Sequence, residues 1–476
     1  MMRQRITAVL ALIGLLSGCG GGGGGGQTAS TGTTTTTTGS SCSLRDRQDW
    51  AFAQLREWYL FPETLPASLD PTPYATVSDY IDALTATARA QHRDRFFTYL
   101  TSIAQENAFF QAGSSAGFGI RLSYDTNQRR VFVNEAFEGA PALAAGIDRG
   151  TEILAIGTSA ADLRNVSDII AAEGVDGITN ALGPTTAGTT RLLRVTDPTN
   201  GIRDLNVTKA DYTLTPVSSR YGARIINDGG RMVGYVNLRT FIDTADPALR
   251  NAFANFRAQG ITNVIVDLRY NGGGLISIAE LFGDLLGGNR STADVFDYMT
   301  FRPEKASNNS HHNFAPQAQS VSPVRLAFIG TTGTASASEL VINGMLPFFR
   351  ANEALVGTNT YGKPVGQIAV DRAACDDRFR IIAFATENGA HQGTYFDGLA
   401  TKMDVTCQAG DDIAHPMGDP LETSTRVALD FLAGRSCTAI AGAPPPGALG
   451  LPPQPPRTLL TPARPTAPQH EVPGLF

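Results

Sequence analysis

The sequence predicts a multi-domain α/β protein, and three observations support that fold class. The chain has 476 residues, which at about 150 residues a domain favours two or three domains. Hydrophobic residues make up 42% of the chain and charged residues 17%, so most of it can bury a core. Short apolar runs alternate with helical patterns through residues 216–437, which is the order expected of a sheet covered by helices.

The N-terminus has the pattern of an export signal. A basic start is followed by an apolar run, Ile6–Leu16, that is too short to span a bilayer. The letters LSGC, which end at Cys19, resemble the bacterial lipobox, in which the cysteine is lipidated. We therefore expect a lipoprotein signal peptide over residues 1–18 and a lipid anchor at Cys19, with an ordinary cleaved signal peptide as the alternative. Gly20 stands where inner-membrane lipoproteins typically carry Asp, so we expect the outer membrane, on the periplasmic side.

Low-complexity segments flank the folded part. Residues 19–41 are rich in Gly and Thr and predict a flexible linker. Residues 438–476 are rich in proline and predict a disordered tail. Residues 42–112 carry apolar and aromatic side chains at helical spacing, from Trp50 to Tyr59, and predict a helical N-terminal domain.

Residues 113–215 predict a β-rich domain. The run GFGIRLSYD, residues 117–125, is followed by a second strand pattern and predicts a hairpin. A short helix over residues 141–145 and a strand over residues 153–156 follow. The letters GAP, AG and ILAIG at 139–157 resemble a PDZ domain of the bacterial protease type, although Thr151 stands where that family usually has Asp. The resemblance implies that an extended peptide adds to an edge strand and that backbone amides receive its carboxylate. Those amides belong to Gly117, Phe118, Gly119 and Ile120. The alternative is a PDZ fold that serves only as a structural lid.

The α/β block of residues 216–437 alternates the two kinds of element. Strands are expected at 233–238, 264–268, 326–329, 354–356 and 381–385. Helices are expected at 247–259, 276–286, 338–349 and 421–432.

Three passages of this block carry chemistry. The first, VDLRYNGGG at 266–274, is a buried strand that runs into a glycine-rich turn, where backbone N–H groups can approach an oxyanion. A phosphate loop is disfavoured there, because neither GxxxxGK[ST] nor GxGxxG is present. The second passage, at 328–340, ends a strand and begins a helix near Ser338, whose hydroxyl is either an N-cap or a nucleophile. The third places Lys363, one of four lysines, between a glycine and a proline.

Together the three passages resemble the C-terminal processing (tail-specific) peptidases, which are serine peptidases with a Ser–Lys dyad and a crotonase-like α/β catalytic domain. The resemblance implies that Ser338 is the nucleophile, Lys363 the general base and Gln367 the residue that orients the lysine. It also implies an oxyanion hole made by the amides of Gly273 and Glu339. Two residues depart from the pattern: Gly272 replaces a usual proline, and Pro364 replaces a usual glycine.

Two other functions compete with this one. A Ser-His-Asp triad that uses His391 or His415 is disfavoured, because no GxSxG elbow occurs. A non-catalytic peptide-binding lipoprotein remains the alternative from another class. We expect protein or peptide substrates, possibly recognised through their C-termini, and no metal or cofactor. The formal net charge of −6 and the lack of a basic stripe disfavour nucleic acid as a partner.

The four cysteines that remain after Cys19 predict disulfides in an exported protein. Four cysteines allow three pairings, and sequence alone selects none. Loop economy favours Cys375–Cys407, because these two lie close together in sequence, with Cys42–Cys437 joining the limits of the fold.

Overall fold

The computed structural model describes residues 42–441 and 457–476. The expected signal peptide, the linker 19–41 and the lipidation site Cys19 therefore lie outside the described residues. Within the described ranges, no helix is both long enough and apolar enough to cross a membrane.

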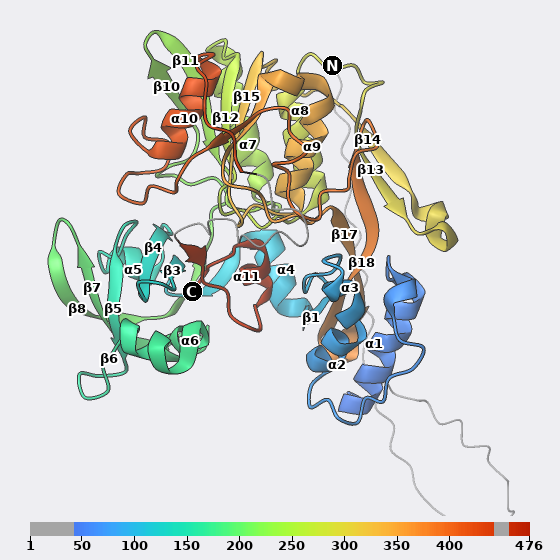
Figure 1. The fold of residues 1–476 in the computed structure, drawn as a ribbon, viewed down its shortest axis with the longest axis vertical. Helices are drawn as coiled ribbons and strands as arrows, with labels where there is room; N and C mark the ends of the chain where they lie inside the picture. Colours follow the sequence, from blue (N-terminus) through green and yellow to red (C-terminus); the bar gives the residue numbers. More distant parts are fainter. Residues whose placement is uncertain (1–41, 442–456) are drawn as a thin grey trace, which may run out of the picture. The chain divides into compact units, whose positions relative to one another are not determined.

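A six-stranded sheet carries the α/β block (Figure 1). Its strand order is β10-β11-β12-β15-β16-β19, parallel except for the antiparallel pair β10–β11. The strands are β10 (Arg224–Asp228), β11 (Arg231–Asn237), β12 (Asn263–Asp267), β15 (Arg325–Gly330), β16 (Glu353–Gly357) and β19 (Thr406–Gln408). Four of the five strands expected in this block lie here. The fifth, at 381–385, belongs to another sheet.

Helices cover both faces of this sheet. They are α7 (Ala245–Ala258), α8 (Ile276–Leu286), α9 (Ala337–Phe349) and α10 (Thr423–Leu432), close to the four expected helices. Alternate strand residues point to opposite faces. Val266 and Phe328 accordingly pack with α7, α8 and α9, whereas Ile265 and Ala327 pack with α10. Strands buried on both faces read as continuous apolar runs, which is why the sequence revealed them.

Parallel strands place their carboxyl ends, and the loops that follow them, at one edge of the sheet. The glycine-rich turn after β12, the turn before α9 and the loop after β16 all leave from that edge. The three passages with chemical signals are therefore neighbours in space.

The second sheet belongs to residues 113–215. Its order is β20-β3-β4-β5-β7-β8, with β6 paired to β5. The expected hairpin is β3 (Ile120–Asp125) and β4 (Arg130–Ala136), followed by β5 (Glu152–Gly157), β6 (Arg164–Asn165), β7 (Thr190–Asp197) and β8 (Gly201–Thr208), while β20 (Thr458–Leu459) comes from the tail. Helices α5 (Pro141–Ala144) and α6 (Val166–Leu182) accompany this sheet, and β2 (Ser114–Gly117) pairs with β9 (Ala210–Thr213) beside it. The PDZ-like assignment of this unit stays a prediction.

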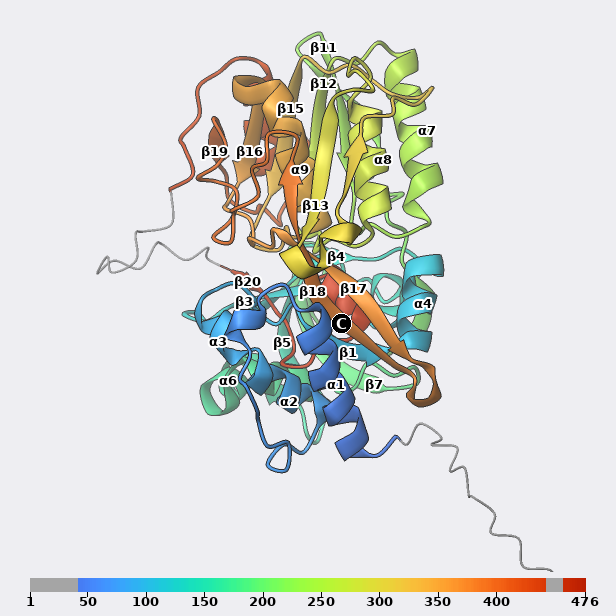
Figure 2. The ribbon, with the colours of Figure 1, turned by 90° about the vertical axis from the view of Figure 1, so that its right-hand side faces the viewer.

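A third sheet ties the N-terminal segment to the α/β block (Figure 2). It contains β1 (Tyr99–Ser102), β13 (Val295–Phe301), β14 (Ser310–Asn313), β17 (Val365–Arg372) and β18 (Asp377–Asn388). Residues 42–112 hold helices α1 (Leu44–Trp58), α2 (Val77–Leu84), α3 (Ala86–Ala90) and α4 (Ile103–Ala112). Strand β1 interrupts these helices and pairs with β18, so the segment is not purely helical. Helices α1, α2 and α3 pack on β17 and β18 through one apolar cluster.

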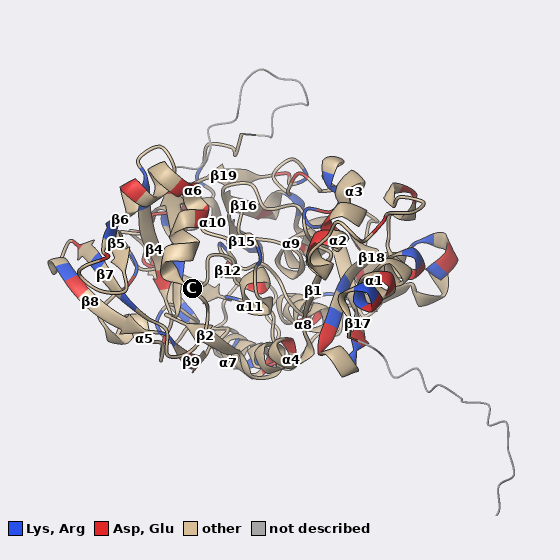
Figure 3. Cartoon of the chain, turned by 90° about the horizontal axis from the view of Figure 1, so that it is seen from below, with Lys and Arg blue, Asp and Glu red and all other residues tan. Residues whose placement is uncertain are grey.

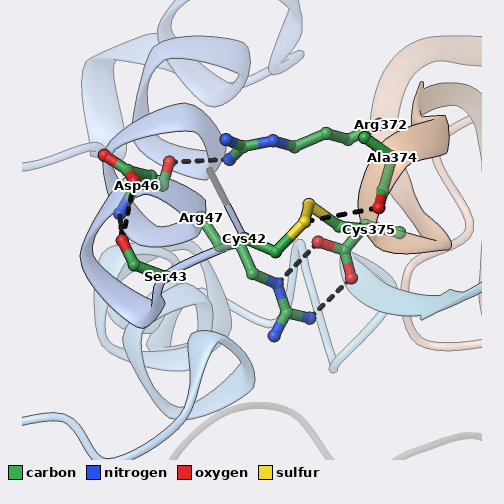
Figure 4. Close-up of a disulfide and its surroundings, with 8 residues drawn as sticks. Cys42, Ser43, Asp46, Arg47, Arg372, Ala374 and Cys375 are labelled. Carbon is green, nitrogen blue, oxygen red and sulfur yellow. Dashed lines mark hydrogen bonds and ion pairs between the residues drawn. A yellow bond between two sulfur atoms is a disulfide. The ribbon is translucent and has the colours of Figure 1, made fainter. Parts of the chain in front are cut away.

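The disulfides differ from the expected pairing. Cys42 is bonded to Cys375, and Cys407 to Cys437. Residues 373–376 form the tip of the β17–β18 hairpin, which reaches the start of α1 (Figure 4). There Arg47 pairs with Asp377 and Arg372 donates to the Asp46 carbonyl oxygen at 2.9 Å. The expected pairing failed because the β17–β18 hairpin brings Cys375 to Cys42, 333 positions away in sequence, which leaves Cys407 to bond to the nearby Cys437.

The proline-rich tail also differs from expectation. Residues 457–476, at the end of this tail, are ordered and contain β20 and α11 (Ala467–Glu471). Strand β20 pairs with β3, and Leu460, Val472, Leu475 and Phe476 are buried. The expectation of disorder was wrong because it was based on the low apolar content of the whole tail. The short apolar end of the tail packs against the rest of the protein.

Charged residues of both signs are interspersed along the elements, for example on α1 and β8 (Figure 3). Arg45 pairs with Asp49 within α1, and Arg194 of β7 pairs with Asp204 of β8.

Candidate active site

The turn between β15 and α9 holds a serine in an unusual backbone conformation. Ser336 has φ 55° and ψ −117°, a region that residues with a Cβ rarely occupy. Such strain persists only where the surrounding structure imposes it, and it is typical of functional turns. The Ser336 side chain is half-buried and lines a cavity of about 190 Å³. Ser336 is therefore a serine that a ligand in the cavity can reach.

Ser338, the expected nucleophile, lies elsewhere. It is fully buried and does not line the cavity. Its hydroxyl donates to the backbone oxygen of Asn271 at 2.9 Å, and the Ala335 N–H donates to the same oxygen at 3.0 Å. Ser338 thus fastens the first turn of α9 to the glycine-rich turn. The sequence pattern pointed to this end of α9, where Ser336 lines the cavity and Ser338 does not.

The glycine-rich turn is fixed from within. Asn271 donates through Nδ2 to the Leu238 oxygen at 2.9 Å and accepts from the Gly273 N–H at 2.9 Å. Gly273 has φ 121°, and a Cβ added to it would lie 2.8 Å from the Ser336 Cβ. Only glycine fits so close to the strained serine. The Gly273 amide, expected in the oxyanion hole, is thus engaged by Asn271 in this conformation.

Glu339 contributes its side chain to this region, and its backbone amide, which the sequence suggested for the oxyanion hole, donates to the Ser336 side chain. The carboxylate is fully buried. Its Oε2 accepts from the backbone N–H of Lys363 at 2.7 Å and of Ser336 at 3.1 Å, and Ser336 and Glu339 form a reciprocal capping box at the start of α9. Its Oε1 accepts from the Thr360 hydroxyl at 2.6 Å and the Gly362 N–H at 2.7 Å. Burial raises the pKa of Glu339, and these hydrogen bonds oppose the shift.

Lys363 and Gln367 lie together, as the sequence suggested. Lys363 Nζ donates to Gln367 Oε1 at 3.2 Å and lies 5.2 Å from the centre of the Phe97 ring. Gln367 lines the cavity and donates through Nε2 to the Phe97 backbone oxygen. Among the described hydrogen bonds, neither serine hydroxyl bonds to the lysine. Catalytic contacts of this kind often tighten only when substrate binds.

The pKa of Lys363 is lowered. Burial is the main cause, and the positive charge of Arg380 acts in the same direction. The carboxylates of Glu471, Asp94 and Glu339 oppose the shift. A lysine in such a place can give up its proton more readily than one in water.

Residues of the C-terminal tail reach the cavity that Ser336 lines. The backbone oxygen of Glu471 accepts from the Gly272 N–H at 3.0 Å, and Glu471 lines the cavity. The His470 ring stacks on Tyr99, with centroids 3.7 Å apart. Burial and the charge of Lys363 lower the pKa of His470 to about 3. No sequence pattern pointed to Glu471 and His470, because the tail was expected to be disordered.

The four predicted peptide-binding residues also face the tail. The N–H groups of Gly119 and Ile120 donate to the backbone oxygen of Phe476 at 2.9 and 3.2 Å. Phe118 is fully buried in the core of the second sheet together with Phe476. A Cβ on Gly117 would lie 2.8 Å from the Phe476 carbonyl carbon.

The two histidines of the competing triad lie apart from the cavity. His391 is largely exposed and pairs with Glu387, and His415 pairs with Asp412. Neither lines the cavity that contains Ser336.

Comparisons with known proteins relate the chain to a family of peptidases. Residues 232–389 match Peptidase family S41. The chain is 28% identical over 282 residues to the chloroplastic C-terminal processing peptidase of Tetradesmus obliquus, covering 55% of this chain and 54% of that protein. It is 26% identical over 338 residues to the chloroplastic carboxyl-terminal-processing peptidase 3 of Arabidopsis thaliana, covering 69% and 60%. The matched part thus spans little more than half the length of these relatives.

The fold has a solved counterpart. The crystal structure of a putative S41 protease from Bacteroides fragilis superposes with a TM-score of 0.62 at 21% identity, covering 81% of this chain and 97% of that one. The mixed α/β, multi-domain architecture is therefore shared with that protein.

Proposed function

Since the chain belongs to the C-terminal processing peptidase family, we propose that it is a serine endopeptidase with Ser336 as nucleophile and Lys363 as general base. The observation that carries this proposal is the shared carboxylate of Glu339, which binds the backbone N–H groups of both residues. Ser336 replaces Ser338 in this role, because Ser336 lines the cavity whereas the hydroxyl of Ser338 is committed to Asn271.

The chemistry follows from these positions. Ser336 Oγ attacks the carbonyl carbon of a peptide bond while its proton passes to the neutral amine of Lys363. The tetrahedral intermediate collapses, the C–N bond breaks, and Lys363 returns the proton to the leaving amine. Water then attacks the acyl-enzyme, with the same lysine as base, and releases the acid and the free serine.

Amides of the glycine-rich turn stabilise the developing oxyanion. The Gly272 N–H already binds a carbonyl oxygen, that of Glu471, next to Ser336. We assign the first donor to Gly272 for this reason, since the Gly273 N–H is held by Asn271.

Gln367 is a positioning residue. Its Oε1 accepts from Lys363 Nζ, and its Nε2 is anchored on the Phe97 backbone, so the amide fixes the direction of the amine. The lowered pKa of Lys363 suits the role of base.

The substrates are exported proteins or peptides, recognised in part through their C-terminal residues by the groove along β3. The enzyme acts on the periplasmic side of the outer membrane, anchored through lipidated Cys19.

An acylating serine-directed probe tests this function. The wild type and Ser338→Ala are expected to be labelled and Ser336→Ala is not, with mass spectrometry placing the adduct on Ser336. If no serine is labelled and no unstructured peptide is cut, the alternative of a non-catalytic peptide-binding lipoprotein is supported instead.

A further inference from the structure

The tail occupies the groove along β3 in the manner of a bound peptide. Phe476 and Ile120 exchange backbone hydrogen bonds, with the Phe476 N–H donating at 2.9 Å and the Ile120 N–H at 3.2 Å. The Leu122 N–H donates to the Gly474 oxygen at 2.8 Å, and Leu475 bridges Arg121 in the antiparallel sense. An earlier part of the tail, β20, pairs with the rest of β3. The tail thereby takes up the backbone edge that an incoming peptide would use.

Side chains anchor this end of the tail. Leu475 and Phe476 are 3% and 2% exposed. Phe476 packs in the core cluster that contains Phe118 and Ile120. The fully buried Arg121 donates to the Pro473 oxygen at 2.5 Å and to the Tyr270 oxygen at 2.9 Å. One guanidinium therefore joins the groove, the tail and the turn that precedes Gly272.

The same tail also lines the proposed catalytic cavity. The Glu471 oxygen accepts from the Gly272 N–H, which is the donor assigned to the oxyanion. The Glu471 side chain lines the cavity and its charge acts on Lys363. A carboxylate there favours the protonated amine, which cannot act as a base.

The backbone of the tail is unsuited to cleavage. Residues 467–471 form α11, and the Val472 N–H donates to the Pro468 oxygen at 2.8 Å. Gln469 Nε2 donates to the Leu475 oxygen at 2.7 Å and so locks the following turn. Helical hydrogen bonds hold the Glu471–Val472 peptide bond away from the extended form in which a peptide is attacked. Helix α11 also packs against α4 (Figure 1).

We propose that residues 457–476 are an intramolecular inhibitor, which fills the β3 groove and covers the catalytic cavity at once. This inference rests on the proposed peptidase function for its effect on activity, but not for the binding itself. A second peptide that pairs with Ile120 and Leu122 must displace Gly474–Phe476, and removal of that anchor frees α11 and Glu471 from the cavity. A peptide with an apolar, aromatic end is thus the activating ligand.

Full-length Phe476→Asp tests the proposal, with Thr461→Asp as the matched control. Thr461 is exposed on the same tail, so its substitution adds the same charge without touching the anchor. We expect Phe476→Asp to bind a dye-labelled VPGLF peptide about tenfold tighter than the wild type and to cleave an unstructured peptide about tenfold faster. Thr461→Asp should match the wild type in both measurements. Equal binding and equal cleavage in the two variants would overturn the proposal.

A second measurement uses the unchanged protein, which guards against misfolding of the variant. The peptide VPGLF corresponds to residues 472–476 and lacks the residues that enter the cavity. An excess of it should accelerate cleavage by the wild type about tenfold, whereas VPGLD should not. Absence of any acceleration contradicts the inference. If neither protein cleaves or reacts with an acylating probe, the proposed function fails, while tighter peptide binding by Phe476→Asp still supports occupation of the groove.

Discussion

Glu339 and Lys363 are joined by a hydrogen bond of 2.7 Å from the lysine's backbone N–H to Oε2 of the buried carboxylate. The same oxygen accepts from the backbone of Ser336, so one atom sets the position of two loops that leave different strands. This contact needs no substrate. It holds the turn that carries the Ser336 hydroxyl and the loop that carries the Lys363 amine in place before any substrate binds.

The assignment of the nucleophile gives the first prediction. Ser336→Ala should lower peptide cleavage by about 10⁴-fold or more, since a group that acts as part of a unit is lost. Ser338→Ala should retain most of the activity and lose about 1 kcal/mol of unfolding free energy, the net value of one hydrogen bond. Cleavage assays and urea unfolding measure the two effects. If Ser338→Ala is the inactive variant and Ser336→Ala is not, the roles are reversed.

The lysine gives the second prediction. Lys363→Ala should lower cleavage by about 10²-fold or more. The double variant with Ser336→Ala should be no worse than Ser336→Ala alone. Gln367→Ala should cause a partial loss, and Gln367→Glu should move the acidic limb of the pH–rate profile to higher pH, because a nearby negative charge raises the pKa of the amine that must be neutral to act as the base.

Lys402 is the matched control, since it is exposed and outside the site. Lys402→Ala should leave the rate of peptide cleavage unchanged. Lys209 is unsuitable as a control, because its Nζ is buried and donates to the backbone oxygens of Gly183 and Pro184. A large loss in Lys402→Ala with none in Lys363→Ala would contradict the assignment.

The buried carboxylate gives the third prediction. Glu339→Gln keeps the shape of the side chain but turns one oxygen into a donor, which then faces N–H groups. We expect a loss of about 2 kcal/mol in the free energy of unfolding, because a buried donor is left unpaired. Cleavage should fall by more than the unfolded fraction explains. Unchanged stability and activity would show that Glu339 does not hold the two loops.

Sequence patterns predicted the α/β sheet well, because strands such as β12 and β15 are buried on both faces and read as apolar runs. They also pointed to the turns whose residues line the cavity. They could not choose between Ser336 and Ser338, because the choice depends on a strained backbone and on the distant Asn271 oxygen.

The predictions of the disulfide pairing and of a disordered tail were wrong for a related reason. Cys42 meets Cys375 only because the β17–β18 hairpin extends to α1, and the tail is ordered only because β3 offers a free edge and a place for Phe476. Contacts between residues hundreds of positions apart leave no local pattern in the sequence. Composition described the tail correctly as proline-rich and still missed its packing.

The disulfides give the fourth prediction. Peptide mapping without reduction should recover Cys42 linked to Cys375 and Cys407 linked to Cys437. The double variant Cys42→Ala, Cys375→Ala should lose about 2–4 kcal/mol of unfolding free energy, since the bond closes a long loop. The single variants should lose as much and form dimers under oxidation. Recovery of Cys375 linked to Cys407 would restore the pairing that loop economy favours.

The last prediction concerns pH and a carboxyl group outside the site. Asp297 is fully buried in β13, and neither of its side-chain oxygens has a hydrogen-bond partner among the described residues. Burial, with the charges of Glu280 and Asp284, raises the pKa of Asp297 to about 7, while His312 opposes the shift. The folded protein thus holds a proton that the unfolded chain releases near pH 4.

The sign of the effect follows from this difference. Between about pH 4 and pH 7 the folded state binds more protons at Asp297 than the unfolded state, so the free energy of unfolding falls as pH rises. The raised pKa values of Glu280 and His312 act in the same direction. The side chain in Asp297→Asn is neutral at every pH. The decrease in the free energy of unfolding with rising pH should therefore be smaller in this variant, by an amount of the order of 4 kcal/mol. Asp397→Asn, at an exposed side chain, should leave the slope unchanged. Urea unfolding at pH 4.5, 6 and 7.5 measures the slopes, and an equally steep fall in Asp297→Asn would place the titrating group elsewhere.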